Sequence, residues 1–175
     1  MPDSARRTVL GIDPGTATLG YGLVAERGAD FELVDYGVLT TSPADSQPIR
    51  LKQIFDGVSA LIRRYQPAEV AVERLFFRHN VTTAIAVGQA RGVTLLAAAI
   101  ANLPVADYTP QQVKQAVAVW GRAPKGQVQE TVRMLLGLAE APQPDDAADA
   151  LAVAICHLHF AKADRLLAQL REPGR

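Results

Sequence analysis

Apolar positions alternate with turn residues in the first half of the chain and predict three strands, a helix and a fourth strand. The strands are expected at residues 8–12, 19–25 and 31–40, and the short connections between them predict an antiparallel meander. Apolar residues then recur at helical spacing over residues 49–65, and the strand that follows ends at Glu73.

The second half of the chain is typical of helices separated by one short strand. A long helix of small residues is expected at 81–103 and a strand at 104–108. The later helices are expected at residues 110–119, 125–136 and from 146 to about 160. A meander followed by alternating strands and helices predicts an α/β domain.

Composition limits the architecture to one domain. At 175 residues with 49% hydrophobic content, the chain is expected to form a single domain over residues 1–175, with a loose tail from about residue 164. The single cysteine, Cys156, lies in an apolar helical segment, which indicates a buried structural thiol and favours a reducing cytosol. The polar first residues do not resemble a signal peptide, and the longest apolar run, 93–101, is too short to span a bilayer. We therefore expect a soluble, cytoplasmic protein with no membrane partner.

Acidic residues end two of the predicted strands and open the last helix. Asp13 follows the first strand, Glu73 ends the fourth, and Asp145, Asp146 and Asp149 start the helix. Because neighbouring parallel strands end at the same edge of a sheet, these carboxylates are expected to converge there. Crowded carboxylates repel each other, and a hard divalent cation such as Mg²⁺ relieves that repulsion. Capping the helix requires only one acid, so the three acids exceed that need.

Basic residues are concentrated between residues 74 and 133, although the net charge of the chain is zero. This segment has two acids, Asp107 and Glu130, against seven basic residues: Arg74, Arg78, Arg91, Lys114, Arg122, Lys125 and Arg133. A basic rim beside an acidic centre suits a metal-dependent phosphodiester enzyme. Ordinary solvated surface charge is an equally open interpretation of the pattern.

Two further patterns each allow a structural and a functional interpretation. Phe76 and Phe77, flanked by Arg74 and Arg78, suit either stacking on unpaired bases or simple core packing. The helix at 81–103 carries small residues four apart, which suit either tight packing within the monomer or a homodimer seam: Ala84, Gly88 and Gly92.

Several segments match one known pattern, in order, over most of the chain: residues 11–15 (Gly-Ile-Asp-Pro-Gly), Glu73 with Phe76, 88–93, 112–115, 127–129 and 146–152. Through these segments the chain resembles the RuvC family of Holliday-junction resolvases. The resemblance implies a ribonuclease-H-like fold, with a five-stranded mixed sheet flanked by helices on both faces. That fold agrees with the meander and the strand–helix alternation.

The resemblance also implies an activity and the residues that perform it. Family members are homodimeric endonucleases that cut two opposed strands of a four-way DNA junction in recombination and repair, together with junction-binding and branch-migration proteins. The positions that match the metal-binding acids of the family are Asp13, Glu73, Asp146 and Asp149, with Asp145 as an alternative to Asp146. The positions expected to contact DNA are Arg74, Phe76, Phe77, Arg78, Lys114 and Lys125.

Phosphodiester hydrolysis predicts a specific division of labour among the acids. Two Mg²⁺ ions about 3.5–4 Å apart, with Mn²⁺ as a substitute, activate a water and stabilise the leaving 3′-oxygen. We expect Asp13 to bridge both ions, Glu73 to complete one site, and Asp146 and Asp149 to complete the other. Three other functions remain open: ATP-dependent phosphoryl transfer, cleavage of RNA by a related nuclease, and metal-free junction binding.

Overall fold

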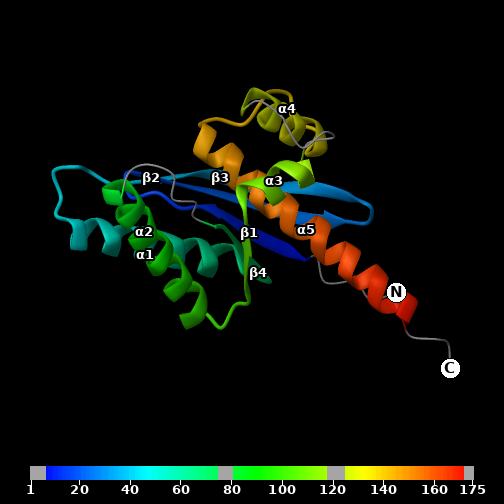
Figure 1. Ribbon diagram of the computed structural model, residues 1–175, viewed down its shortest axis with the longest axis horizontal. Coiled ribbons are helices and arrows are strands. Elements are labelled where there is room, and N and C mark those ends of the chain that lie inside the picture. Colours follow the sequence, from blue (N-terminus) through cyan, green and yellow to red (C-terminus); the bar gives the residue numbers. More distant parts are fainter. Residues whose placement is uncertain (1–6, 75–80, 118–124, 172–175) are drawn as a thin grey trace.

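The computed structural model describes residues 7–74, 81–117 and 125–171. Over these residues the chain forms one five-stranded mixed sheet with helices on both faces (Figure 1). The strands are β1 (Thr8–Asp13), β2 (Thr18–Arg27), β3 (Asp30–Thr40), β4 (Glu69–Glu73) and β5 (Val105–Tyr108). The helices are α1 (Gln47–Tyr65), α2 (Val81–Ile100), α3 (Pro110–Val117), α4 (Lys125–Leu135) and α5 (Asp145–Arg171).

The sheet has the strand order β3-β2-β1-β4-β5. The first three strands pair antiparallel, which confirms the predicted meander. β4 pairs parallel to β1 on one side and to β5 on the other. The carboxyl ends of β1, β4 and β5 therefore lie at one edge of the sheet, where ligand sites of open α/β sheets are found.

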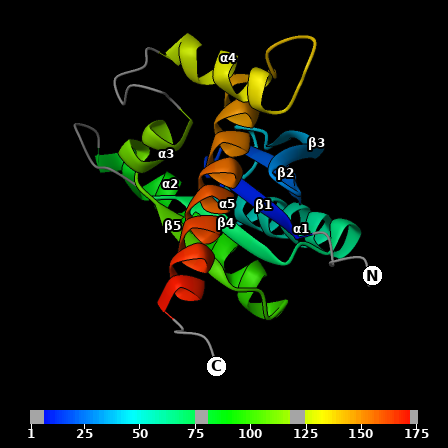
Figure 2. The same cartoon turned by 90° about the vertical axis from the view of Figure 1, so that its right-hand side faces the viewer.

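Two apolar clusters hold the helices against the two faces of the sheet. α1 and α2 pack on one face through a cluster that includes Leu10, Ile12 and Ile54. α5 crosses the other face, with α3 and α4 packed beside it (Figure 2). Both faces of the central strand β1 are thus covered, and its residues 9–12 are fully buried or nearly so.

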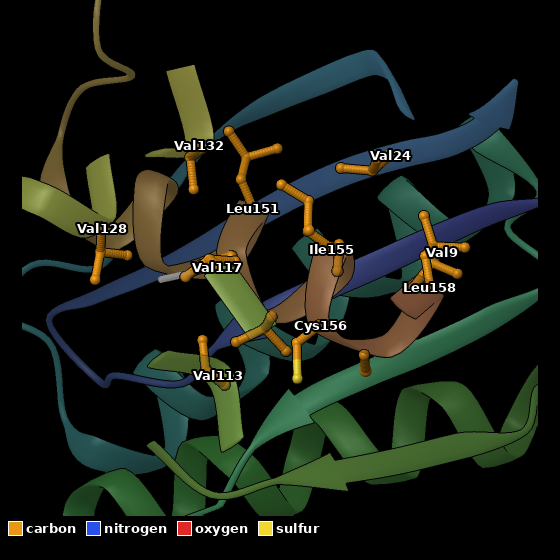
Figure 3. Close-up of a cluster of buried hydrophobic side chains, with 14 residues drawn as sticks. Val9, Val24, Val113, Val117, Val128, Val132, Leu151, Ile155, Cys156 and Leu158 are labelled. Atoms are coloured by element: carbon orange, nitrogen blue, oxygen red, sulfur yellow. The ribbon is translucent and has the colours of Figure 1, made fainter. Parts of the chain in front are cut away.

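α5 is the central element of the second cluster (Figure 3). Leu151, Ile155 and Leu158 are completely buried there, and burial of each such side chain contributes about 1.5–3 kcal/mol. Cys156 is also fully buried, and this burial raises the pKa of its thiol to about 12. The cysteine is a packing residue, as its apolar sequence context indicated.

The ends of two helices differ from the sequence prediction. α2 ends at Ile100 rather than 103, because the residues at 101–102 turn and Asn102 adopts a positive φ of 56°. α5 continues to Arg171 rather than ending near 160. The residues after Phe160 include good helix formers and contain no glycine or proline before Pro173, so nothing in the local sequence stops the helix.

Most of the helix α2 is apolar, not only the apolar run at residues 93–101 that the sequence shows. Within the described part of the chain, Thr82–Ile100 is the one segment long and apolar enough to cross a membrane by length and composition, which is weak support for a membrane role. Its packing against α1 explains part of this apolar character. Ile85, Leu96 and Ile100 remain 57%, 52% and 63% exposed, so part of the helix surface is apolar and uncovered.

Candidate active site

Two strand ends place the first two carboxyl groups side by side. Asp13 is the last residue of β1 and Glu73 the last residue of β4, and the pairing of Ile12 with Val72 sets these parallel neighbours in register. A side-chain hydrogen bond joins the carboxyl groups of Asp13 and Glu73. The expected convergence of these two acids is therefore present.

The first turn of α5 approaches the same sheet edge because the strands beneath it carry glycine. A Cβ atom added to Gly20 of β2 would lie 1.9 Å from the backbone oxygen of Asp146. A Cβ atom on Gly11 of β1 would lie 2.2 Å from the oxygen of Ala150. The absence of side chains at these glycines lets the helix backbone rest directly on the sheet. This close contact brings Asp146 and Asp149 within electrostatic range of Asp13.

The crowding of the carboxylates raises the pKa of Asp13 to about 8. Burial is the largest cause, followed by repulsion from Glu73, Asp149 and Asp146. Burial and the charge of Asp149 also raise the pKa of Glu73, while its hydrogen bond to Asp13 and the charge of Lys114 lower it. Asp13 responds to all three other acids and is thus at the electrostatic centre of the cluster.

The neighbouring acids Asp145 and Asp146 point to different surroundings. The side-chain amide of Gln129 in α4 donates a hydrogen bond of 2.6 Å to Asp145 Oδ1. Asp146 instead lines a cavity with the loop that follows Asp13, and its charge affects the pKa of Asp13. Asp146 is therefore the member of the pair that belongs to the carboxylate cluster.

The donor chemistry of the cluster suits a hard divalent cation. Four carboxyl groups from three elements could supply oxygen ligands, and their mutual repulsion is the electrostatic condition that a cation would relieve. Over residues 7–74, 81–117 and 125–171, no three Asp, Glu, His or Cys side chains are already arranged to hold a metal ion. A cation bound by both Asp13 and Glu73 would take the place of the hydrogen bond between them.

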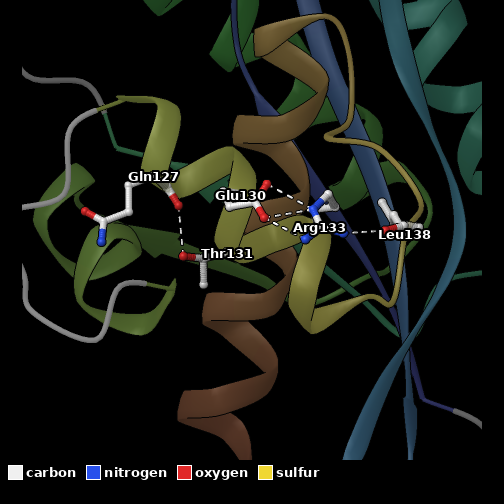
Figure 4. A network of polar contacts seen from close by, with 5 residues as sticks. All are labelled: Gln127, Glu130, Thr131, Arg133 and Leu138. Atoms are coloured by element: carbon white, nitrogen blue, oxygen red, sulfur yellow. Dashed lines mark hydrogen bonds and ion pairs between the residues drawn. The ribbon is translucent and has the colours of Figure 1, made fainter.

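The basic residues around the acids divide into two groups. Lys114 of α3 is exposed and close enough to lower the pKa of Glu73, and Arg74 directly follows Glu73 at the surface. By contrast, Arg91 pairs with Asp107 at 2.5 Å, and Arg133 pairs with Glu130 at 2.6 Å and also bonds to a backbone carbonyl (Figure 4). Arg91 and Arg133 are engaged within the protein, so the basic excess near the site is smaller than the sequence suggested.

Four of the residues expected to contact DNA have side chains outside the described part of the structure. Phe76, Phe77 and Arg78 lie outside the described residues. Lys125 begins α4, but only its backbone is described. The predicted DNA contacts of these four residues stay predictions.

Arg50 is a candidate that the sequence analysis missed. It lies in the first turns of α1 and lines the same cavity as Asp146. The residues three and four positions away on either side, at 46, 47, 53 and 54, include no acid that would pair with it along the helix. That lack of a helical partner is the signal that the sequence offered.

The fold and the site together define a ribonuclease-H-like, metal-dependent nuclease. The sequence pattern of the family described as crossover junction endodeoxyribonuclease RuvC matches residues 9–157. Curated RuvC proteins of Rubrobacter xylanophilus and Chloroflexus aggregans are each 59% identical over 87% of this chain, covering 85% and 93% of those proteins. The chain belongs to the RuvC family.

Solved structures agree with this assignment. Thermus thermophilus RuvC in complex with a Holliday junction substrate aligns with a TM-score of 0.87 and 43% identity, over 90% of this chain and 96% of that one. The yeast mitochondrial Holliday junction resolvase Ydc2 shares the fold at a TM-score of 0.66 and 16% identity, over 93% of this chain and 83% of that one. These likenesses confirm the predicted family and fold.

The raised pKa of Asp13 predicts that the metal-free protein loses stability as pH rises. Unfolded Asp13 ionises near 3.8, whereas folded Asp13 stays protonated up to about 8, so ionisation favours the unfolded chain between these values. From pH 5 to 8.5 we expect the free energy of unfolding to fall by about 1–3 kcal/mol in EDTA. Urea titrations across this range measure the slope, and Asp13→Asn should flatten it. An equally steep slope in the variant would assign the effect to other groups.

Proposed function

We propose that this protein cuts four-way DNA junctions by metal-dependent phosphodiester hydrolysis. The observation that carries the proposal is the convergence of Asp13, Glu73, Asp146 and Asp149 at one sheet edge in a chain of the RuvC family. The Thermus thermophilus relative was solved with a Holliday junction substrate, which supports the same class of DNA for this chain.

The four carboxylates would hold divalent cations, and Asp13 is best placed to be shared because it responds to all three other acids. Two Mg²⁺ ions, for which Mn²⁺ substitutes, would supply an activated attacking water and stabilisation of the leaving 3′-oxygen. Lys114 and Arg74 supply positive charge at the edge of the cluster, where they attract the phosphates of a DNA strand. Cation binding requires ionised carboxylates, so Asp13 must release its proton as the site loads.

A panel of substrates tests this function. The purified protein is incubated in Mg²⁺ with a synthetic four-way junction, a linear duplex of the same sequences, a structured RNA and ATP. We expect paired, symmetric nicks in the junction and no turnover of the other three. Hydrolysis of ATP or RNA in preference to the junction would replace the proposal with phosphoryl transfer or ribonuclease activity, and binding without cuts would indicate a junction-binding module.

We further propose that the protein acts as a homodimer with α2 at the seam. The apolar residues Leu96 and Ile100 are exposed, and Gly92 has no heavy atom of another element within 4 Å of the position of an added Cβ. These residues are four apart and lie on one side of the helix, where they suit a two-fold contact. A dimer would present two active sites to the two equivalent strands of a junction, which is why we expect paired cuts.

Leu96→Asp is expected to convert the dimer to a monomer, because it places a charge in an apolar contact. Light scattering at micromolar concentration measures the molecular mass. We expect the variant to have the mass of a monomer and to make fewer paired cuts than the parent. Met134→Asp is the control, since Met134 is a similarly exposed apolar residue on α4. A dimeric mass for Leu96→Asp would place the seam elsewhere. Cooperation with junction-binding and branch-migration proteins in the cytoplasm stays a prediction from the family.

A further inference from the structure

A cavity lies beside the carboxylate cluster and is lined by groups that recognise phosphate. It has a volume of about 540 Å³ and is bounded by the loop at residues 15–18, Arg50 of α1, the start of α2 and Asp146. Thr82 and Thr83 supply hydroxyl-bearing side chains from the first turn of α2. Because Asp146 forms part of the wall, whatever occupies the cavity is adjacent to the carboxylate cluster.

Arg50 is oriented toward this space by a chain of hydrogen bonds. Its Nε–H donates to Thr41 Oγ1 at 2.8 Å, and the Thr41 hydroxyl donates to the backbone oxygen of Thr16 at 2.7 Å. The Thr16 hydroxyl donates in turn to the oxygen of Ala86 in α2, also at 2.7 Å. The guanidinium group is therefore held at its Nε by Thr41, which in turn is bonded to the loop that follows Asp13.

The remaining donors of Arg50 form no ion pair with a carboxylate of the described residues, although Asp146 lines the same cavity. Within the parts of the chain that the structure describes, Arg50 forms no ion pair, whereas Arg7, Arg91 and Arg133 each pair with an acid. A guanidinium group with its terminal N–H groups free matches two oxygens of a phosphate. The first turn of α2 lines the cavity, and the positive end of this helix dipole also favours the negative charge of a phosphate.

We propose that this cavity binds a phosphate of the DNA strand being cut, next to the phosphate at which cleavage occurs, and that Arg50 contacts it directly. This inference rests on the proposed nuclease function. The carboxylate cluster repels DNA until it is loaded with cations, so a fixed cation beside it is needed to position the strand. Arg50 holds the neighbouring phosphate while the acids act on the scissile one.

A cycle of protein and DNA changes tests the contact. Junctions carry a single neutral methylphosphonate at successive linkages around the cut site, and single-turnover cleavage is measured for the parent, Arg50→Ala and Arg63→Ala. Arg63 is the matched control, because it is an exposed arginine in the last turn of the same helix. We expect Arg50→Ala to slow cleavage by about ten- to a hundredfold, the range for loss of a hydrogen bond to a charged group. One methylphosphonate position should slow the parent and Arg63→Ala similarly and leave Arg50→Ala without further loss.

Binding measured in EDTA supplies a readout that does not depend on cleavage. The slope of the logarithm of junction affinity against the logarithm of salt concentration should fall in magnitude by about one in Arg50→Ala, which is the change for the loss of one phosphate contact. The slope should stay unchanged in Arg63→Ala. Arg50→Lys lacks the Nε–H that bonds to Thr41 but keeps the positive charge. Because that charge can still attract the phosphate, Arg50→Lys should retain more activity than Arg50→Ala.

Three outcomes separate the possibilities. In the first outcome, every methylphosphonate slows Arg50→Ala by the same factor as the parent, and Arg50→Lys is as impaired as Arg50→Ala. Arg50 would then only stabilise the loop, and the inference fails. If Arg50→Ala cuts junctions as fast as the parent, the inference also fails. If the parent itself does not cut junctions, the proposed function fails first.

Discussion

Asp13→Asn is expected to lower the rate of junction cleavage by at least about a thousandfold, which corresponds to roughly 4 kcal/mol in the activation barrier. The substitution preserves the size of the side chain and removes the carboxylate at the centre of the cluster, which under the proposed mechanism is the ligand shared by the cations. Junction binding in EDTA should be retained, because Asp13 of the metal-free protein is protonated below about pH 8 and its replacement by Asn changes no charge there. Single-turnover cleavage in Mg²⁺ and binding titrations on the same preparation measure the two effects separately.

Asp56→Asn is the control for this substitution. Asp56 is an exposed acid of α1 that pairs with Lys52 at 2.6 Å, and it takes no part in the carboxylate cluster. Its replacement should leave cleavage near the parent rate. Near-normal cleavage by Asp13→Asn would remove Asp13 from the chemistry.

Gly20→Ala should disable the site without removing any chemical group from it. The added Cβ would lie 1.9 Å from the backbone oxygen of Asp146, so the first turn of α5 must move away from β2. We expect a loss of about 2–4 kcal/mol in the free energy of unfolding, typical of a severe steric conflict in a packed interior. The same displacement carries Asp146 and Asp149 away from Asp13, and cleavage should fall by about a hundredfold or more, since small misplacements of catalytic groups have effects of this size.

Gly126→Ala is the matched control for the glycine argument. Gly126 lies in α4, and a Cβ atom there meets no other heavy atom within 4 Å. Alanine at that position should be neutral or stabilise the protein by up to about 1 kcal/mol, because it favours the helix. Thermal unfolding and junction cleavage are measured for both variants. Equal stabilities and equal cleavage rates of Gly20→Ala and Gly126→Ala would show that the close approach of α5 to β2 has no role.

The strands and helices were largely predictable because their signals are local. The meander, the amphipathic face of α1 and the strand ending at Glu73 each follow from residue spacing within one segment. The end of α5 was not predictable from the apolar pattern, since the helix continues beyond the last fully buried residue, Leu158, through a segment of good helix formers.

The parts of the site that depend on contacts between distant segments were harder to predict. The convergence of Asp13 and Glu73 required only that β1 and β4 be parallel neighbours, which strand-end acids suggest. The choice of Asp146 over Asp145 depends on Gln129 from another helix, and the pairing of Arg91 with Asp107 spans the connection between two elements. Sequence spacing does not contain these contacts. The family resemblance supplied the DNA-contacting positions.

The most direct measurement is a crystal structure of the protein soaked in Mn²⁺, with anomalous scattering used to locate the ions. We expect Mn²⁺ between the carboxylates of Asp13, Glu73 and Asp149, with the hydrogen bond between Asp13 and Glu73 broken and Asp146 turned toward the same centre. Strong Mn²⁺ peaks elsewhere, with these side chains directed to separate places and no ion among them, would show that the acids do not form one metal site.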